Sequence, residues 1–107
     1  MALFSIPRLR VAGLAAAVPA TRESNAKYAW IPQKERELLI KTVGVAEKRV
    51  ISEGTATSDL CFAAAGKLLD ELGWKRDEIG LLIFVSQTRD YLIPATSGIL
   101  QDRLGLS

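Results

Sequence analysis

The sequence of 107 residues contains no histidine and a single cysteine, Cys61. Without histidine the chain cannot assemble a Ser-His-Asp or Cys-His catalytic arrangement, and one cysteine forms neither an internal disulfide nor a tetrahedral zinc site. Cys61 lies one position from an apolar helical stripe and beside Phe62, which indicates a free, buried core residue rather than a nucleophile. We therefore predict no catalytic residue, no metal site and no cofactor in this chain.

Long apolar runs are also absent, since no stretch approaches the ~18 residues that a membrane-spanning helix requires. Arg8 and Arg10 interrupt the start of the chain, which excludes the unbroken apolar segment of a signal peptide. We expect a soluble, cytoplasmic protein with no membrane partner.

Neither positive nor negative charge is in large excess, because the chain has 14 lysines and arginines and 12 aspartates and glutamates. The seven aromatic residues are scattered, whereas nucleic-acid modules concentrate positive charge and expose aromatics for stacking, so we expect no nucleic-acid partner. The balance is uneven, at +5 over residues 1–50 and −3 over residues 51–107. This basic first half is interpreted either as a solvated surface or as a surface for an acidic partner or a phosphate-bearing ligand.

The apolar patterning that is present predicts an α/β fold. Three stretches indicate strands: residues 8–18, 48–52 and 81–85. The last, Leu-Leu-Ile-Phe-Val, is a continuous apolar run typical of a central parallel strand covered on both faces. Three stretches with apolar residues at helical spacing predict helices: residues 32–43, a middle helix that follows Thr57 or Ser58 and ends before Gly73, and residues 94–104. Thr57 or Ser58 is expected to cap the middle helix, and a glycine follows each helix as a stop signal. Strand, helix, strand and helix make half of a parallel α/β layer.

Four passages of the sequence carry a family resemblance. Each is weak alone, but their order and spacing make the resemblance specific when they are taken together. They are VAGLAAAVPATRESNAKYA, TVGVAEKRV, TATSDLCFAAAGKLLDELG and DEIGLLIFVSQTRDYLIPATSGILQDRLGL. In this order the chain resembles the N-terminal part of the β-ketoacyl-acyl-carrier-protein synthase III family, which are condensing enzymes of the thiolase fold. The resemblance covers almost the whole sequence.

This resemblance implies decarboxylative Claisen condensation, in which an acyl group moves to a cysteine and a malonyl carrier protein supplies the attacking carbanion. The expected partners of the intact enzyme are acyl-CoA or an acyl carrier protein, malonyl carrier protein and a second subunit of a homodimer. The cysteine, histidine and asparagine of that mechanism lie later in the family's chain. Residues 1–107 are therefore expected to be a single incomplete N-terminal thiolase-like domain that is inactive alone.

The resemblance also implies three substrate-binding residues, Thr42, Val43 and Ile93. The family's tryptophan and arginine that hold the adenine end of CoA match Leu38 and Thr42, and Val43 replaces a usual threonine. These departures favour a carrier-protein-bound acyl donor, or a divergent enzyme, over ordinary acetyl-CoA priming. Ile93 matches the residue, often phenylalanine, that ends the partner subunit's acyl tunnel, which implies longer or branched acyl groups; the alternative is that Ile93 packs beneath its own loop.

A second interpretation stays open beside the enzyme. The chain could be a non-catalytic α/β interaction module that self-associates through an exposed strand edge, because unpaired strand edges recruit other strands.

Overall fold

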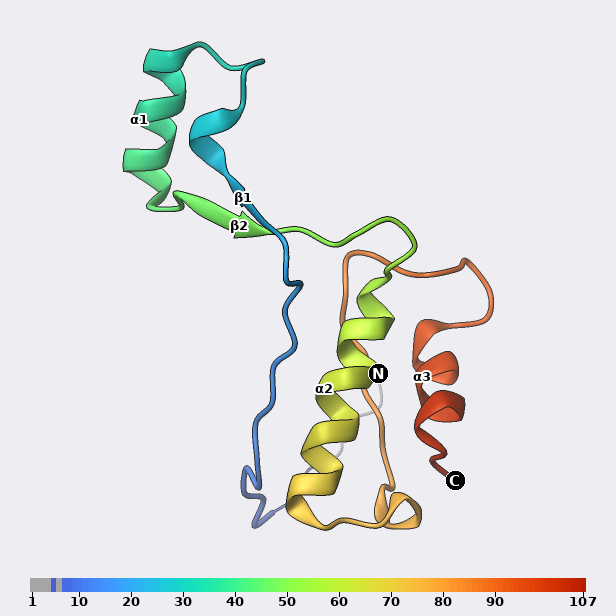
Figure 1. The fold of residues 1–107 in the computed structure, drawn as a ribbon. Helices are drawn as coiled ribbons and strands as arrows, with labels where there is room; N and C mark the ends of the chain where they lie inside the picture. Colours follow the sequence, from blue (N-terminus) through green and yellow to red (C-terminus); the bar gives the residue numbers. More distant parts are fainter. Residues whose placement is uncertain (1–4, 6) are drawn as a thin grey trace.

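The computed structural model describes Ser5 and residues 7–107, which form two lobes joined by extended chain (Figure 1). The smaller lobe contains β1 (Arg22–Ser24), the 3₁₀ turn η1 (Asn25–Lys27), α1 (Gln33–Val43) and β2 (Glu47–Arg49). The larger lobe contains α2 (Thr57–Leu72), η2 (Arg76–Glu78) and α3 (Thr96–Leu104). The predicted domain of residues 1–107 begins in residues that lie outside this description, and it stays a prediction.

The three predicted helices are present, and their ends have local causes. α1 and α2 end at Gly44 and Gly73, whose φ angles of 75° and 66° lie in the left-handed region that favours glycine. The amide of Gly44 donates to the carbonyl of Ile40 at 2.8 Å, which closes the last turn of α1. α3 begins at Thr96, two residues later than the predicted start.

The start of α2 differs from the prediction. Neither Thr57 nor Ser58 caps the helix; the N-cap is Ala56, and the carboxylate of Asp59 accepts a hydrogen bond from its amide at 2.8 Å. The Thr57 hydroxyl instead lies 2.7 Å from the hydroxyl of Thr88. A carboxylate at the third helical position therefore replaces the hydroxyl cap, as acidic residues in first turns commonly do.

Strand pairing is where the structure departs furthest from the prediction. Among the described residues the only sheet is the two-stranded ribbon of β1 and β2, which pair antiparallel with Arg22 opposite Arg49. The predicted parallel core strands at residues 8–18 and 81–85 are wrong as hydrogen-bonded elements, because both segments are extended without a ladder. An apolar run predicts that a segment is extended and buried. A strand also needs hydrogen bonds to a second backbone segment, and the apolar run does not specify which segment that is. The broader α/β class still describes this mixture of helices and extended segments.

The core lies where α2 meets α3 and the chain that follows α3. Leu69, Leu104 and Leu106 are buried together, and Leu82 packs against them. The radius of gyration is 18.6 Å, against about 13 Å for a compact domain of this length. The molecule is therefore elongated and leaves many apolar side chains uncovered. Within the described residues, no helix combines the length and hydrophobicity needed to span a bilayer.

Candidate functional site

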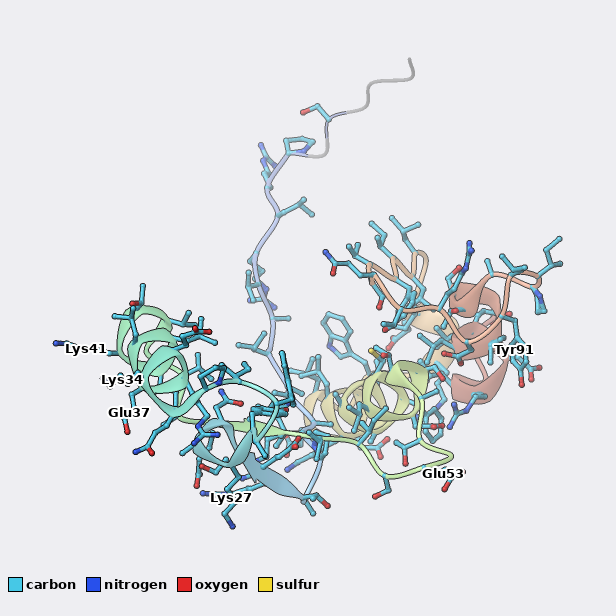
Figure 2. The ribbon with its side chains drawn as sticks, turned by 90° about the horizontal axis from the view of Figure 1, so that it is seen from above. Lys27, Lys34, Glu37, Lys41, Glu53 and Tyr91 are labelled. Carbon is cyan, nitrogen blue, oxygen red and sulfur yellow. The ribbon has the colours of Figure 1, made fainter. Side chains whose placement is uncertain are left out.

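The three predicted substrate-binding residues do not meet in one pocket. Thr42 and Val43 lie in the last turn of α1, whereas Ile93 lies in the loop before α3. Figure 2 labels their sequence neighbours Lys41 and Tyr91 at opposite ends of the molecule. A single copy of this chain therefore presents two separate surfaces, one on each lobe.

Val43 lines an apolar hollow of about 310 Å³ in the smaller lobe, together with Leu39 and two aromatic residues. The rings of Tyr28 and Trp30 meet edge to face, with centroids 5.9 Å apart. The ammonium of Lys48 lies 4.7 Å from the centre of the Tyr28 ring. Hydrogen bonding to Tyr28 raises the pKa of Lys48 above its ordinary value of 10.5, so this side chain stays charged. The hollow can hold an apolar group but offers no nucleophile.

Thr42 is not one of the residues that line this hollow. Its hydroxyl donates to the carbonyl of Leu38, one turn earlier in α1, at 2.8 Å. The side chain of Leu38 is itself exposed. This face of α1 therefore presents a leucine and a hydroxyl that is engaged within the helix.

Ile93 lies in a loop whose two ends are fixed by hydrogen bonds. The Ser86 hydroxyl donates to the carbonyl of Thr88 at 2.7 Å, and the amide of Asp90 donates to the hydroxyl of Thr96 at 3.3 Å. Between these anchors the side chain of Ile93 is 88% exposed. It does not pack beneath its own loop, so the alternative interpretation of this residue is wrong for this chain.

α3 is joined to the start of α2 by a pair that the sequence did not reveal. Arg103 of α3 lies 2.9 Å from the carboxylate of Asp59, and its guanidinium covers the ring of Phe62 at 4.6 Å. The Ala56 amide, followed by Arg103, holds the pKa of Asp59 below its ordinary value of 3.8. The sequence signal was only an acidic residue in a helical first turn, which the helix dipole already explains.

Cys61 is free, and it is half-buried rather than buried as predicted. It lines an apolar groove of about 460 Å³ between α2, α3 and residues 82–85. The lining contains no side chain that could act as a base, and a thiol without a base or positive neighbour is a poor nucleophile. In the part of the chain that the structure describes, no three histidine, cysteine, aspartate or glutamate side chains gather as a metal site would require.

No family model matches the chain. Individual proteins do match it. The sequence is 30% identical over 102 residues to the β-ketoacyl-[acyl-carrier-protein] synthase III of Laribacter hongkongensis, which covers 95% of this chain and 32% of that protein. The chain therefore spans about a third of the length of this relative.

Solved structures give the same result for the fold. The crystal structure of a 3-oxoacyl-(acyl-carrier protein) synthase from Burkholderia xenovorans matches with a TM-score of 0.80 and 37% identity, over 88% of this chain and 28% of that one. An OleA variant from Xanthomonas campestris matches with a TM-score of 0.78 and 29% identity, over 91% of this chain and 31% of that one. The predicted resemblance to the β-ketoacyl-[acyl-carrier-protein] synthase III family, and with it a thiolase-like fold, is therefore confirmed along nearly the whole chain.

Proposed function

We propose that this chain supplies the N-terminal part of a 3-oxoacyl-[acyl-carrier-protein] synthase III-like enzyme. That enzyme condenses an acyl thioester with malonyl carrier protein, as part of fatty-acid or polyketide-type biosynthesis in the cytoplasm. The observation that carries the proposal is the combined match in sequence order and backbone, with a TM-score of 0.80 at 37% identity. This chain contributes scaffold and pocket wall, and the nucleophile and its partners belong to the other two thirds of such an enzyme.

The end of α1 supports a carrier-protein-bound acyl donor. Leu38 is exposed where the family uses a tryptophan, and Thr42, where the family uses an arginine, has its hydroxyl engaged within the helix. Leu38 offers no aromatic surface for adenine, and Thr42 offers no cation for its phosphates. A donor that is held through its protein carrier requires neither of these contacts.

The loop before α3 supports a role for Ile93 in acyl-chain selection within a homodimer. An apolar side chain that is 88% exposed at the tip of an anchored loop is stabilised if another surface covers it. In the proposed dimer that surface is the partner's acyl tunnel, where isoleucine leaves more room than phenylalanine.

In the full-length enzyme we expect Ile93→Phe to shift preference toward short acyl donors. One changed pocket contact is typically worth about 1–3 kcal/mol in discrimination. The measurement is kcat/KM for a series of acyl chain lengths, and Leu92→Phe, at the adjacent exposed position, is the matched control. If the profile of a folded, dimeric Ile93→Phe enzyme is unchanged, Ile93 lies outside the tunnel.

The enzyme proposal is tested by grafting. This chain would replace the matching third of the Laribacter hongkongensis relative, and condensation would be measured with malonyl carrier protein. We expect the chimera to be active and the 107-residue chain alone to be silent, because its only thiol has no base. Stoichiometric acylation of Cys61 in the isolated chain would show that the active site has been misplaced.

A second candidate is the non-catalytic interaction module. The observation that favours it is the extended segment at residues 81–85, which lacks a strand partner among the described residues. A chimera that folds and dimerises but shows no turnover would favour this module over the enzyme.

A further inference from the structure

The smaller lobe carries lysines that pair with no acidic side chain. Residues 22–49 contain seven lysines and arginines and four glutamates. Four of the seven cations are engaged, either in an ion pair or by a backbone carbonyl: Arg22, Arg36, Lys48 and Arg49. The other three form no ion pair within the part of the chain that the structure describes, and all are exposed: Lys27, Lys34 and Lys41. Their positive charge is therefore free to meet a partner.

Two of these lysines lie on one face of α1, with an exposed leucine between them. Lys34 and Lys41 are seven residues apart, which is two turns or about 10 Å along the helix axis. Leu38 follows the first by four residues and precedes the second by three, so it shares their face, and its side chain is 64% exposed. Glu37 also lies on this side of α1 (Figure 2), but its carboxylate accepts a hydrogen bond from Gln33 at 2.8 Å. The face thus presents an apolar side chain between two unpaired ammonium groups.

The exposure of this face follows from the way α1 is built. The other apolar residues of the helix line the hollow of the smaller lobe: Leu39, Ile40 and Val43. Leu38 lies at least about 100° around the axis from each of them, on the outward side. Glu35 lies about 100° around the axis from Lys34 and outside this face. Because lysines are almost never fully buried without a partner charge, we expect Lys34 and Lys41 to stay in contact with water in a longer chain as well.

We propose that Lys34, Leu38 and Lys41 dock the carrier protein that delivers the acyl donor. The docking element is a helix with two carboxylates seven residues apart and an apolar residue between them. When two helices pack side by side, a partner with this repeat places one carboxylate against each lysine and its apolar residue against Leu38. The distance of about 10 Å between the two lysine positions suits such an extended acidic surface better than a single phosphate group. This inference rests on the proposed function, because it names the contact for the donor of that enzyme.

Surface plasmon resonance of the full-length enzyme with a hexanoyl-loaded acyl carrier protein tests the contact without turnover. We expect Lys34→Glu combined with Lys41→Glu to raise Kd by at least about tenfold, mainly through slower association, because complementary charge steers the encounter. Added salt should weaken binding of the parent more than binding of this variant. Leu38→Ser should speed dissociation, since it removes the apolar contact.

Lys27→Glu combined with Lys48→Glu is not a suitable control, because Lys48 already pairs with Glu23. Lys27→Glu alone is the matched control: Lys27 is an exposed, unpaired lysine of the same lobe, and Figure 2 labels it away from Lys34 and Lys41. Its Kd should stay within about twofold of the parent's. Far-UV circular dichroism checks that every variant keeps its helices. An unchanged Kd for the double variant, or an equal loss in Lys27→Glu, would overturn the proposal.

Steady-state kinetics of the same enzymes separate a carrier protein from CoA. We expect the double variant to raise KM for hexanoyl carrier protein and to leave KM for hexanoyl-CoA unchanged. If KM rises for hexanoyl-CoA alone, the two lysines bind the phosphates of CoA, and docking of a carrier protein at this face is wrong. An enzyme that turns over neither donor would refute the proposed function, whereas the binding measurement would still decide whether this face docks the carrier protein.

Discussion

Asp59 shows how much of the larger lobe depends on one side chain. Its carboxylate accepts the Ala56 amide at the start of α2 and pairs with Arg103 of α3 at 2.9 Å. Both interactions favour the charged form and hold the pKa of Asp59 below its ordinary value. A carboxyl whose pKa is lower in the folded state stabilises the fold above its unfolded pKa and loses that contribution as the pH falls.

We expect Asp59→Asn to lower stability at neutral pH and to flatten the acid limb of the stability profile. In the parent chain, stability falls as the pH drops from the unfolded pKa near 3.8 through the lower folded pKa. Urea unfolding at about pH 7 and about pH 3 measures this difference. Asp102→Asn, at an exposed carboxylate of α3, is the control; parallel pH profiles for Asp59→Asn and the parent would contradict the argument.

At the scale of elements, the contact between α2 and α3 supplies most of the burial. Leu100 is 2% exposed and faces the groove beside Leu104, whereas α1 contains no buried residue. The stability of the larger lobe should therefore depend on a few leucines, and truncating one of them should remove much of its free energy of unfolding.

Leu100→Ala is expected to cost about 2–5 kcal/mol, because it removes buried methyl groups and leaves a cavity between two helices. A small protein has a total stability of about 5–15 kcal/mol, so the variant should be close to unfolded. Leu92→Ala changes a side chain that is 75% exposed and should stay within about 0.5 kcal/mol of the parent. Urea unfolding followed by circular dichroism compares the two; equal losses would mean that Leu100 does not anchor the contact.

The helices were predictable and the strand partners were not, for a physical reason. A helix is specified locally by apolar spacing and by a glycine that accepts a left-handed φ, as at Gly44 and Gly73. A strand partner is specified by a distant backbone: the pairing of Arg22 with Arg49 joins segments separated by all of α1. Family resemblance implied a site role for Ile93, which stays a prediction, and sequence spacing does not reveal the loop hydrogen bonds between which this exposed residue lies.

At the scale of the whole molecule, the two lobes are expected to differ in stability. Amide exchange in α1 should be at least about tenfold faster than in α2, after correction for intrinsic rates, because local opening costs less where few apolar contacts are lost. Hydrogen exchange with mass spectrometry of peptides from the two helices makes the comparison. Equal protection of α1 and α2 would show that the lobes unfold as one unit.

The chain enters and leaves the smaller lobe at one place. The guanidinium of Arg49 donates to the carbonyls of Pro19 and Ala20 at 2.9 and 3.1 Å, and the Val50 amide donates to the Thr21 carbonyl at 3.1 Å. Hydrogen bonds already hold the two ends of the smaller lobe together. The residues between these ends can therefore be shortened, lengthened or exchanged without moving the chain on either side. The smaller lobe should therefore be exchangeable as a unit. A homologous lobe whose apolar hollow is lined by different residues could replace it at this junction, and α2 and α3 would keep their positions.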